Sequence, residues 1–506
     1  MLAKVWGSTV CGLDAFLVDV EVDVAQGMPI FDIVGLPDTA VKEARERVRS
    51  AVKNCGYSIP TRRITVNLAP ADLRKEGSAF DLPIAIALIA ASEQLPRTVL
   101  EDAVFVGELS LDGGLRPVAG VLPMAILSRN QNKKLIVPRA NAREAMLVDG
   151  LEVVPVSSLT ELVAILTGYR QAEPILPEET VAVKAQSLDF RDIAGQEQAK
   201  RALEVAAAGG HNVLFVGPPG SGKTMLARHL PTILPPMRKE EALEVTKIYS
   251  VAGLLTEKGV LVSERPFRAP HHSVSNGGLI GGGKIPNPGE VSLAHRGVLF
   301  LDELPEFSKK TLEQLRQPIE DGHVTIARVN ATLTYPSEVM LIAAMNPCPC
   351  GYLGDAVKPC TCSPGEAGRY ANKISGPLLD RIDMELHVPR LLYHELAAER
   401  RGDSSEQIRL RVAAARERQQ ERYKENRVFC NARLGHRHLR KLMISEGAEA
   451  LLRSAFTKLS LSARAHDRLL KVARTIADLA GTDMIDTAHI AEAVSYRALA
   501  RPGQGT

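Results

Sequence analysis

The chain has 506 residues, a formal net charge of +3 at pH 7, and 45% hydrophobic residues. This length predicts about three domains, and so small a net charge excludes a protein whose overall field alone binds nucleic acid. No apolar run in the sequence reaches membrane-spanning length, and the N-terminus lacks the form of a signal peptide. We therefore expect a cytoplasmic protein without membrane contact, whose seven cysteines are thiols or metal ligands rather than disulfides.

Residues 1–170 alternate strand-like apolar runs with helical patterns, which predicts a layered α/β domain. The stretch 171–189, rich in proline, glutamate and small residues, is predicted to be a linker between domains. The predicted strands of the first domain are 16–24, 31–34, 64–68, 103–106, 134–137 and 151–154, and its predicted helices are 40–53, 82–91 and 120–128.

Two segments of this domain, 75–82 and 106–118, resemble the proteolytic domain of Lon proteases and, more closely, the Lon-like domain of the recombination protein RadA. The resemblance implies a Lon-like fold, of the ribosomal protein S5 domain 2 type. Lon proteases use a serine–lysine dyad, but the serine position here falls on Ala79 and the lysine position on Leu122, with Ser78 one residue away. A methyl group cannot attack a carbonyl, so we expect a scaffold without protease activity. An unrelated α/β domain is the alternative.

The middle of the chain contains a phosphate-loop motif in its required setting. The apolar run 211–216 suits a buried strand, 225–230 suits a helix, and GxxxxGK[ST] lies between them. In such loops backbone N–H groups surround phosphate oxygens, the lysine reaches the β- and γ-phosphates, and the threonine ligates Mg²⁺. We therefore predict a site for ATP and Mg²⁺. Its predicted binding residues are Gly217, Pro218, Pro219, Gly220, Ser221, Gly222, Lys223, Thr224 and Asp302, of which Thr224 and Asp302 are the predicted Mg²⁺ ligands.

Two further apolar runs end in polar side chains. The run 298–301 is followed by Asp302 and Glu303, at the edge where open α/β sheets bind ligands. Asp302 is expected to hold Mg²⁺, and Glu303 to polarise the attacking water as general base. The run 338–345 ends in Asn346, whose side chain is placed to orient that water.

These motifs resemble those of AAA+ ATPases. The stretch 190–200 resembles the segment that contacts adenine, Asn346 corresponds to sensor 1, and Arg464 matches sensor 2. The stretch 375–384 resembles the arginine-finger segment of the magnesium-chelatase and MCM helicase branch. That resemblance implies that Arg381 enters the site of a neighbouring subunit and stabilises the transferring phosphoryl group. An ordinary surface ion pair is the alternative for Arg381.

Two insertions indicate what the ATPase acts on. The Gly/Pro-rich stretch 265–290 matches the pore-facing helix-2 insert of that branch, and 323–335 alternates as a β-hairpin should and matches its pre-sensor-1 hairpin. Arg268, Lys284 and Arg328 are our candidates for contacts with the phosphate backbone of DNA. Solvated loop charge is the alternative for each.

Four cysteines follow Asn346 in a CxC…CxC pattern, at Cys348, Cys350, Cys360 and Cys362. Four thiolates so close in sequence can form a tetrahedral, structural Zn²⁺ site. The usual spacing is CxxC, so reduced thiols without a metal are an equal alternative.

The C-terminal part, 391–506, is predicted to be a helical lid. It contains a long charged helix at 404–427 and a strongly periodic helix at 461–479, for which Ser462 is the predicted N-cap.

Over residues 1–502 the chain resembles the YifB/ComM family of magnesium-chelatase-like AAA+ ATPases. The resemblance implies a Lon-like domain at 1–170, an AAA+ core at 190–390 and the lid at 391–506. It also implies a homo-oligomeric, hexameric ring that hydrolyses ATP and moves on single-stranded or branched DNA. Such a helicase would promote branch migration in homologous recombination and natural transformation.

Two alternatives stay open. The first is a chelatase-type remodelling motor subunit that acts on a protein partner, including one that inserts metal into a porphyrin. The second is a scaffold or an ATP-dependent protease. Ala79 and Leu122 are evidence against a protease. The evidence against a scaffold is Lys223, Asp302, Glu303 and Arg381.

Overall fold

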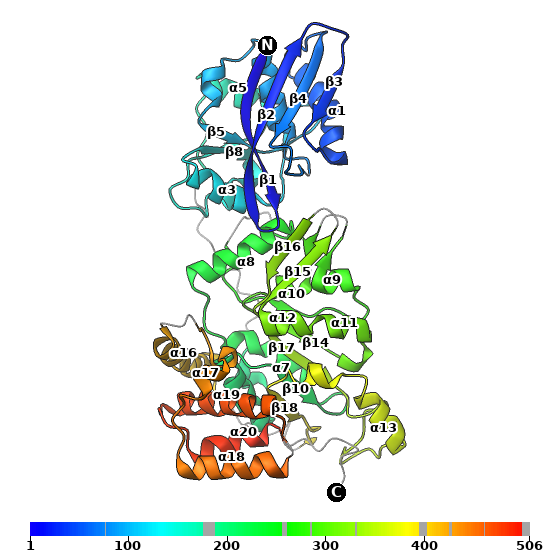
Figure 1. The fold of residues 1–506 in the computed structure, drawn as a ribbon, viewed down its shortest axis with the longest axis vertical. Coiled ribbons are helices and arrows are strands. Elements are labelled where there is room, and N and C mark those ends of the chain that lie inside the picture. Colours follow the sequence, from blue (N-terminus) through cyan, green and yellow to red (C-terminus); the bar gives the residue numbers. More distant parts are fainter. Residues whose placement is uncertain are drawn as a thin grey trace. The chain divides into compact units, whose positions relative to one another are not determined.

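The fold is that of a computed structural model, in which the chain divides into two compact units (Figure 1). The first comprises Met1–Ala182 with Lys239–Val262, and the second comprises Val183–Arg238 with Ser263–Thr506. The segment Lys239–Val262 thus packs with the N-terminal part, although it follows the phosphate loop in sequence. The structure describes residues 1–75, 77–175, 188–255, 261–283, 286–328, 331–393, 402–424, 428–459 and 461–497.

A seven-stranded mixed sheet, in the order β3-β4-β2-β1-β5-β8-β9, forms the first unit. The strands β1, β2 and β4 pair antiparallel, whereas the β3–β4, β1–β5, β5–β8 and β8–β9 pairs are parallel. The expected α/β architecture is therefore confirmed as a mixed sheet with helices. Its strands are β1 (Leu2–Cys11), β2 (Asp14–Ala25), β3 (Phe31–Val34), β4 (Arg63–Ala69), β5 (Ala103–Phe105), β8 (Lys134–Pro138) and β9 (Val153–Val156), with a small ribbon of β6 (Glu108–Leu109) and β7 (Leu115–Arg116).

Helices cover both faces of this sheet. Because successive strand residues point to opposite faces, Ala103 and Phe105 of β5 pack in one apolar cluster, with α1 and α2, while Val104 packs in another, with α3 and α4. Every residue of α2 is buried. The helices of this unit are α1 (Thr39–Asn54), α2 (Asp81–Ala91), α3 (Val121–Asn130), α4 (Ala142–Ala145), α5 (Leu159–Leu166) and α8 (Lys239–Val251).

The strand β1 is the element of this sheet that the apolar pattern did not predict. Gly7 interrupts its middle, and a Cβ at Gly7 would lie 3.3 Å from the side chains of Phe80 and Val20. Glycine in a strand marks such a close approach. The same residue that weakens the sequence signal therefore lets the strand pack against α2.

The second unit contains a five-stranded sheet in the order β11-β14-β17-β10-β18, in which every pair is parallel. The strands β14 and β17 are buried along their whole length, as expected of parallel strands covered on both faces. The three predicted strands that lead into the motifs are confirmed. The strands are β10 (Val213–Val216), β11 (Phe267–Arg268), β14 (Val298–Leu301), β17 (Met340–Met345) and β18 (Met384–His387).

Helices of the C-terminal stretch pack on this core through α6 and η4 (Leu230–Ile233). The helix α19 begins at the predicted N-cap, since the Ser462 hydroxyl accepts a hydrogen bond from the Ala465 N–H. The buried Asp478 of α19 pairs with Arg422 of α16 at 2.6 Å, which ties the two helices together, and with Arg474 of its own helix at 3.0 Å. The helices are α6 (Glu197–Gly209), α7 (Lys223–His229), α9 (Asn276–Ile280), α10 (Glu290–Leu293), α11 (Lys309–Gln314), α12 (Arg316–Asp321), α13 (Pro364–Ala371), α14 (Gly376–Leu379), α16 (Ser405–Arg422), α17 (His436–Leu439), α18 (Glu446–Lys458), α19 (Ala463–Ala480) and α20 (Thr487–Ser495).

The predicted hairpin is also confirmed. Strand β15 (His323–Arg328) pairs antiparallel with β16 (Ala331–Pro336), with Arg328 opposite Ala331. Among the residues that the structure describes, none of the helices combines the length and the hydropathy that crossing a membrane requires.

Candidate ATP site

Three predicted motifs meet at one edge of the parallel sheet. Val216 of β10 lies in register with Met345 of β17, and Gly217 donates its N–H to the Met345 carbonyl at 3.2 Å. Asp302 leaves the carboxyl end of β14, which neighbours β17. This carboxyl edge is where open α/β sheets bind ligands, so the phosphate loop, Asp302 and Asn346 come together as the sequence predicts.

Steric contact and backbone conformation both require glycine at positions in the phosphate loop. A Cβ at Gly217 would lie 2.2 Å from the Val388 carbonyl oxygen, closer than any side chain tolerates. Gly220 and Gly222 have φ angles of +77° and +91°, a left-handed conformation that residues with a Cβ rarely adopt. The loop can therefore turn its amides inward without a side chain in the way.

Two groups in this loop fit a bound phosphate. The Lys223 Nζ is buried among oxygens, donating to the carbonyls of Gly217 at 2.7 Å and Pro218 at 2.9 Å and to Asn346 Oδ1 at 3.4 Å. Burial lowers the pKa of Lys223, and a phosphate would supply a full negative charge beside it. The Ser221 hydroxyl is buried without a hydrogen-bond partner, so a phosphate oxygen has a donor ready there.

The two predicted Mg²⁺ ligands touch each other. The Thr224 hydroxyl donates to Asp302 Oδ2 at 2.7 Å. Hydroxyl and carboxylate oxygens are the donors that Mg²⁺ accepts in nucleotide sites, together with phosphate oxygens and water. When bound, Mg²⁺ would neutralise charge on the β- and γ-phosphates.

Glu303, the predicted general base, has an unusual backbone. Its φ and ψ are 51° and 45°, the left-handed region, which costs a residue with a side chain about 1–2 kcal/mol. The Asp302 carboxylate steadies it by accepting its N–H at 2.9 Å. Such strain is found where function needs one side-chain direction.

His272 lies against Glu303, a contact that the sequence analysis missed. Its Nδ1 is 3.4 Å from Glu303 Oε2, and its ring packs edge-on against Phe307 and 4.0 Å from the ring of His271. The insert that contains His272 is thus in contact with the predicted base. A pair of histidines in a Gly/Pro-rich loop was the available signal, but it does not say what the loop touches.

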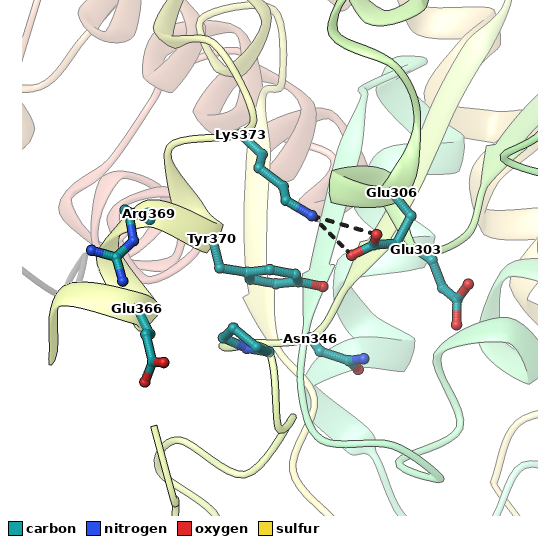
Figure 2. Close-up of a pocket in the computed structure, with 8 residues that line it drawn as sticks. Glu303, Glu306, Asn346, Glu366, Arg369, Tyr370 and Lys373 are labelled. Atoms are coloured by element: carbon teal, nitrogen blue, oxygen red, sulfur yellow. Dashed lines mark hydrogen bonds and ion pairs between the residues drawn. The ribbon is translucent and has the colours of Figure 1, made fainter. Parts of the chain in front are cut away.

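A cavity of about 470 Å³ opens beside Glu303 and Asn346 (Figure 2). The helix α13 supplies its other wall, and Lys373, just beyond that helix, lies 3.3 Å from Glu306. Burial raises the pKa of Tyr370 to about 12, so its hydroxyl stays protonated and able to donate. No motif in the sequence indicates that residues of α13 line this cavity. The cavity is lined by Glu303, Glu306, Asn346, Pro349, Glu366, Arg369, Tyr370 and Lys373.

Arg381, the predicted finger, is engaged within its own chain. Its guanidinium pairs with Glu320 and donates to the carbonyls of Arg316 at 3.0 Å and Pro377 at 2.7 Å, which leaves the side chain 13% exposed. It lines a different cavity from the one beside Glu303. Arg464 is exposed in the first turn of α19 and, among the described residues, makes no hydrogen bond or ion pair.

One of the three candidate DNA contacts is partly neutralised. Arg268 makes two hydrogen bonds of 2.6 Å to the Glu290 carboxylate. Arg328 ends strand β15, but its side chain is not among those described, and Lys284 lies outside the described residues. All three contacts stay predictions.

The two Lon-dyad positions are packed in apolar surroundings. Ala79 and Leu122 are both buried and belong to the same hydrophobic cluster of the first unit. The neighbouring Ser78 hydroxyl donates to Glu108. Neither position offers a nucleophile or a base, which is consistent with the expected loss of peptidase chemistry.

An open parallel sheet with a phosphate loop, an Asp-Glu pair and an asparagine at one edge defines the core of a P-loop ATPase. Residues 189–396 match the family model for magnesium chelatase, subunit ChlI, and 20–141 match that for subunit ChlI of Mg-chelatase. Residues 402–497 match the C-terminal part of the same subunit. The chain is thus a magnesium-chelatase-like AAA ATPase, a class whose membership implies ATP hydrolysis.

The relatives narrow this class to a family. The chain is 47% identical to the YifB protein of Salmonella typhimurium, over 99% of this chain and 98% of that protein. It is 46% identical to the competence protein ComM of Haemophilus influenzae, over the same shares. The chain belongs to the YifB/ComM family. A further similarity, 30% identity to Lon protease 2 of Bacillus subtilis, covers 31% of this chain and 29% of that protease.

Proposed function

We propose that this protein is an ATP-hydrolysing ring motor that acts on DNA, a helicase that promotes branch migration during homologous recombination and natural transformation. The observation that carries this proposal is a phosphate loop with its lysine, threonine and aspartate in place, in a chain that is similar over nearly its whole length to a protein named for competence. Lys223 contacts Asn346 at 3.4 Å, and Thr224 contacts Asp302 at 2.7 Å. What they lack within one chain is a guanidinium from the predicted finger segment.

That shortfall supports the proposal of a ring. Arg381 does not line the cavity beside Glu303. For its guanidinium to contact the phosphates of a bound ATP, we therefore propose that it enters the site of a second copy of the chain. A closed set of identical head-to-tail contacts makes a ring. We propose a homo-oligomer, and a hexamer by the family resemblance.

DNA is the proposed track because two insertions interrupt the parallel-sheet core, and one of them contacts the predicted base. The first, residues 265–290, contains Arg268 and also His272, which contacts Glu303. The second is the hairpin of β15 and β16, with Arg328 at its end. Contact between a loop and the predicted base offers a physical route by which a bound polyanion changes the rate of hydrolysis.

The ATPase rate is expected to rise when DNA is added. Single-stranded, forked and four-way DNA should be compared at fixed ATP, and each stimulation should weaken as salt increases, since released counterions drive binding to phosphates. Arg328→Ala should reduce the stimulation, whereas Arg409→Ala, which removes an equal charge from the exposed face of α16, should not. A branch-migration assay on four-way junctions tests the finer activity. If no DNA of any shape changes the rate, the proposal is wrong.

The second candidate is a chelatase-type motor subunit that remodels a protein partner. The magnesium-chelatase family models that match most of the chain favour it. Its distinguishing result is an ATPase rate that stays constant with DNA and rises with a protein partner. A porphyrin substrate or an unfolded protein should have no effect if the chain is a DNA motor.

A further inference from the structure

The four cysteines after Asn346 converge on one point of the second unit. Their Sγ atoms all lie within 4.8 Å of one another. Cys348 Sγ is 3.3 Å from Cys350 Sγ and 3.6 Å from Cys360 Sγ, and the Cys350 and Cys360 sulfurs are also 3.6 Å apart. Twelve residues separate Cys348 from Cys360, so the loop has folded back to make this cluster.

These distances suit a shared metal better than paired sulfurs. Zn–S bonds of about 2.3 Å at tetrahedral angles place neighbouring sulfurs about 3.8 Å apart. A disulfide places them at about 2.05 Å. Three of the sulfurs lie 3.3–3.6 Å apart and all four lie within 4.8 Å, so as thiolates they would repel one another unless a cation binds between them. A tetrahedral S₄ set is typical of Zn²⁺, with iron as the competitor.

The loop is built to hold the sulfurs in place. The Cys350 N–H points at Cys362 Sγ at 3.4 Å, the kind of amide–sulfur contact that steadies a bound thiolate. The Asp355 carboxylate accepts N–H groups from Val357 and Lys358 and closes the turn between the two pairs. Ser363 follows Cys362 directly and caps α13.

Two cationic side chains lie over the ring of Tyr352, close in sequence to the cluster. Four thiolates and one Zn²⁺ carry a net charge of −2. The Lys358 ammonium and the Arg390 guanidinium both lie over the ring of Tyr352, two residues after Cys350. Arg390 also pairs with the Asp355 carboxylate, at 3.6 Å, in the turn between the two cysteine pairs.

The cluster also touches the ATP site at both ends. Gly351 approaches the phosphate loop so closely that a Cβ there would lie 2.7 Å from Pro219 Cδ. On the other side, α13 carries Tyr370 to the wall of the cavity beside Glu303 (Figure 2). A tie between the cysteine pairs thus fixes both the phosphate loop and the far wall of that cavity.

We propose that Cys348, Cys350, Cys360 and Cys362 bind one Zn²⁺ ion, and that this ion clamps α13 to the phosphate loop and so sets the shape of the ATP site. The ion is structural, because four protein ligands leave no open coordination position. Its effect on nucleotide rests on the ATP site described above, whereas the metal site itself is independent of any action on DNA.

The first test is metal content, measured on the full-length chain purified under reducing conditions. One zinc per chain is expected, and the double variant Cys360→Ser/Cys362→Ser should contain none. Cys430→Ser is the matched control, since Cys430 is the cysteine of the second unit that lies outside the cluster, and it should keep its zinc. Replacement of zinc by Co²⁺ should give the absorption spectrum of a tetrahedral tetrathiolate site, a readout that needs no variant to fold.

The second test asks whether loss of the zinc site changes ATP hydrolysis. In the zinc-free double variant, ATP turnover should fall about tenfold or more, because small misplacements of reacting groups cost up to ~10²-fold in rate. Circular dichroism should show that the parallel sheet survives. A wild-type chain that binds iron, forms disulfides under reducing conditions, or stays free of zinc when zinc is supplied overturns the site. A folded, zinc-free variant with unchanged ATP affinity and turnover overturns the clamp.

Discussion

Glu303→Gln is expected to lower the rate of ATP hydrolysis by about 10²–10⁴-fold, the range that a positioned general base contributes. ATP binding should persist, because the groups that face the phosphates, Lys223, Ser221 and Thr224, are unchanged. The amide keeps the size of the carboxylate but cannot accept the proton of water. Single-turnover hydrolysis and the binding of a fluorescent ATP analogue measure the two effects separately.

Glu306→Gln is the control for this result. Glu306 lines the same cavity, but its carboxylate pairs with Lys373 at 3.3 Å, and both side chains are about half exposed. Loss of such a surface pair costs at most about 1 kcal/mol. Equal losses of hydrolysis in the two variants, or loss of ATP binding in Glu303→Gln, would remove Glu303 from the role of base. If the oligomer forms with ATP bound, Glu303→Gln should also trap it.

Arg381→Ala is expected to reduce hydrolysis by about 10³–10⁵-fold, as loss of an arginine finger does elsewhere. Lys223→Ala alone should abolish nucleotide binding. The informative experiment mixes the two variants. A Lys223→Ala subunit still offers its Arg381 to a neighbour whose phosphate loop is intact, so mixed oligomers should regain part of the activity. Absence of any recovery would place the action of Arg381 within its own chain.

The Glu320→Gln variant tests whether Arg381 acts in catalysis or only supports the local fold. In the single chain Arg381 is held by Glu320 and by two carbonyls. The Glu320→Gln change weakens that hold without removing the guanidinium, so hydrolysis should remain near that of the wild type. A collapse of activity in Glu320→Gln matching that of Arg381→Ala would mean that the pair supports the fold around α12.

The sequence alone was sufficient to predict the elements that depend on interactions between residues close together in the chain. Four apolar residues leading into a glycine-rich loop predict β10, and Ser462 before a periodic run predicts the start of α19. Backbone geometry and helix capping depend on residues only a few positions apart, so local sequence patterns are enough to predict them. The alternation that predicts the hairpin is local in the same sense.

The tertiary structure decided which of these elements meet. No spacing in the sequence reveals that His272 contacts Glu303, that Glu290 pairs with Arg268, or that α13 lines the cavity beside the predicted base. The same holds for Lys239–Val262, which follows the phosphate loop but packs in the first unit. Such contacts join residues tens or hundreds of positions apart. These long-range contacts are determined by the burial of apolar faces across the whole chain, so a local sequence pattern does not predict them.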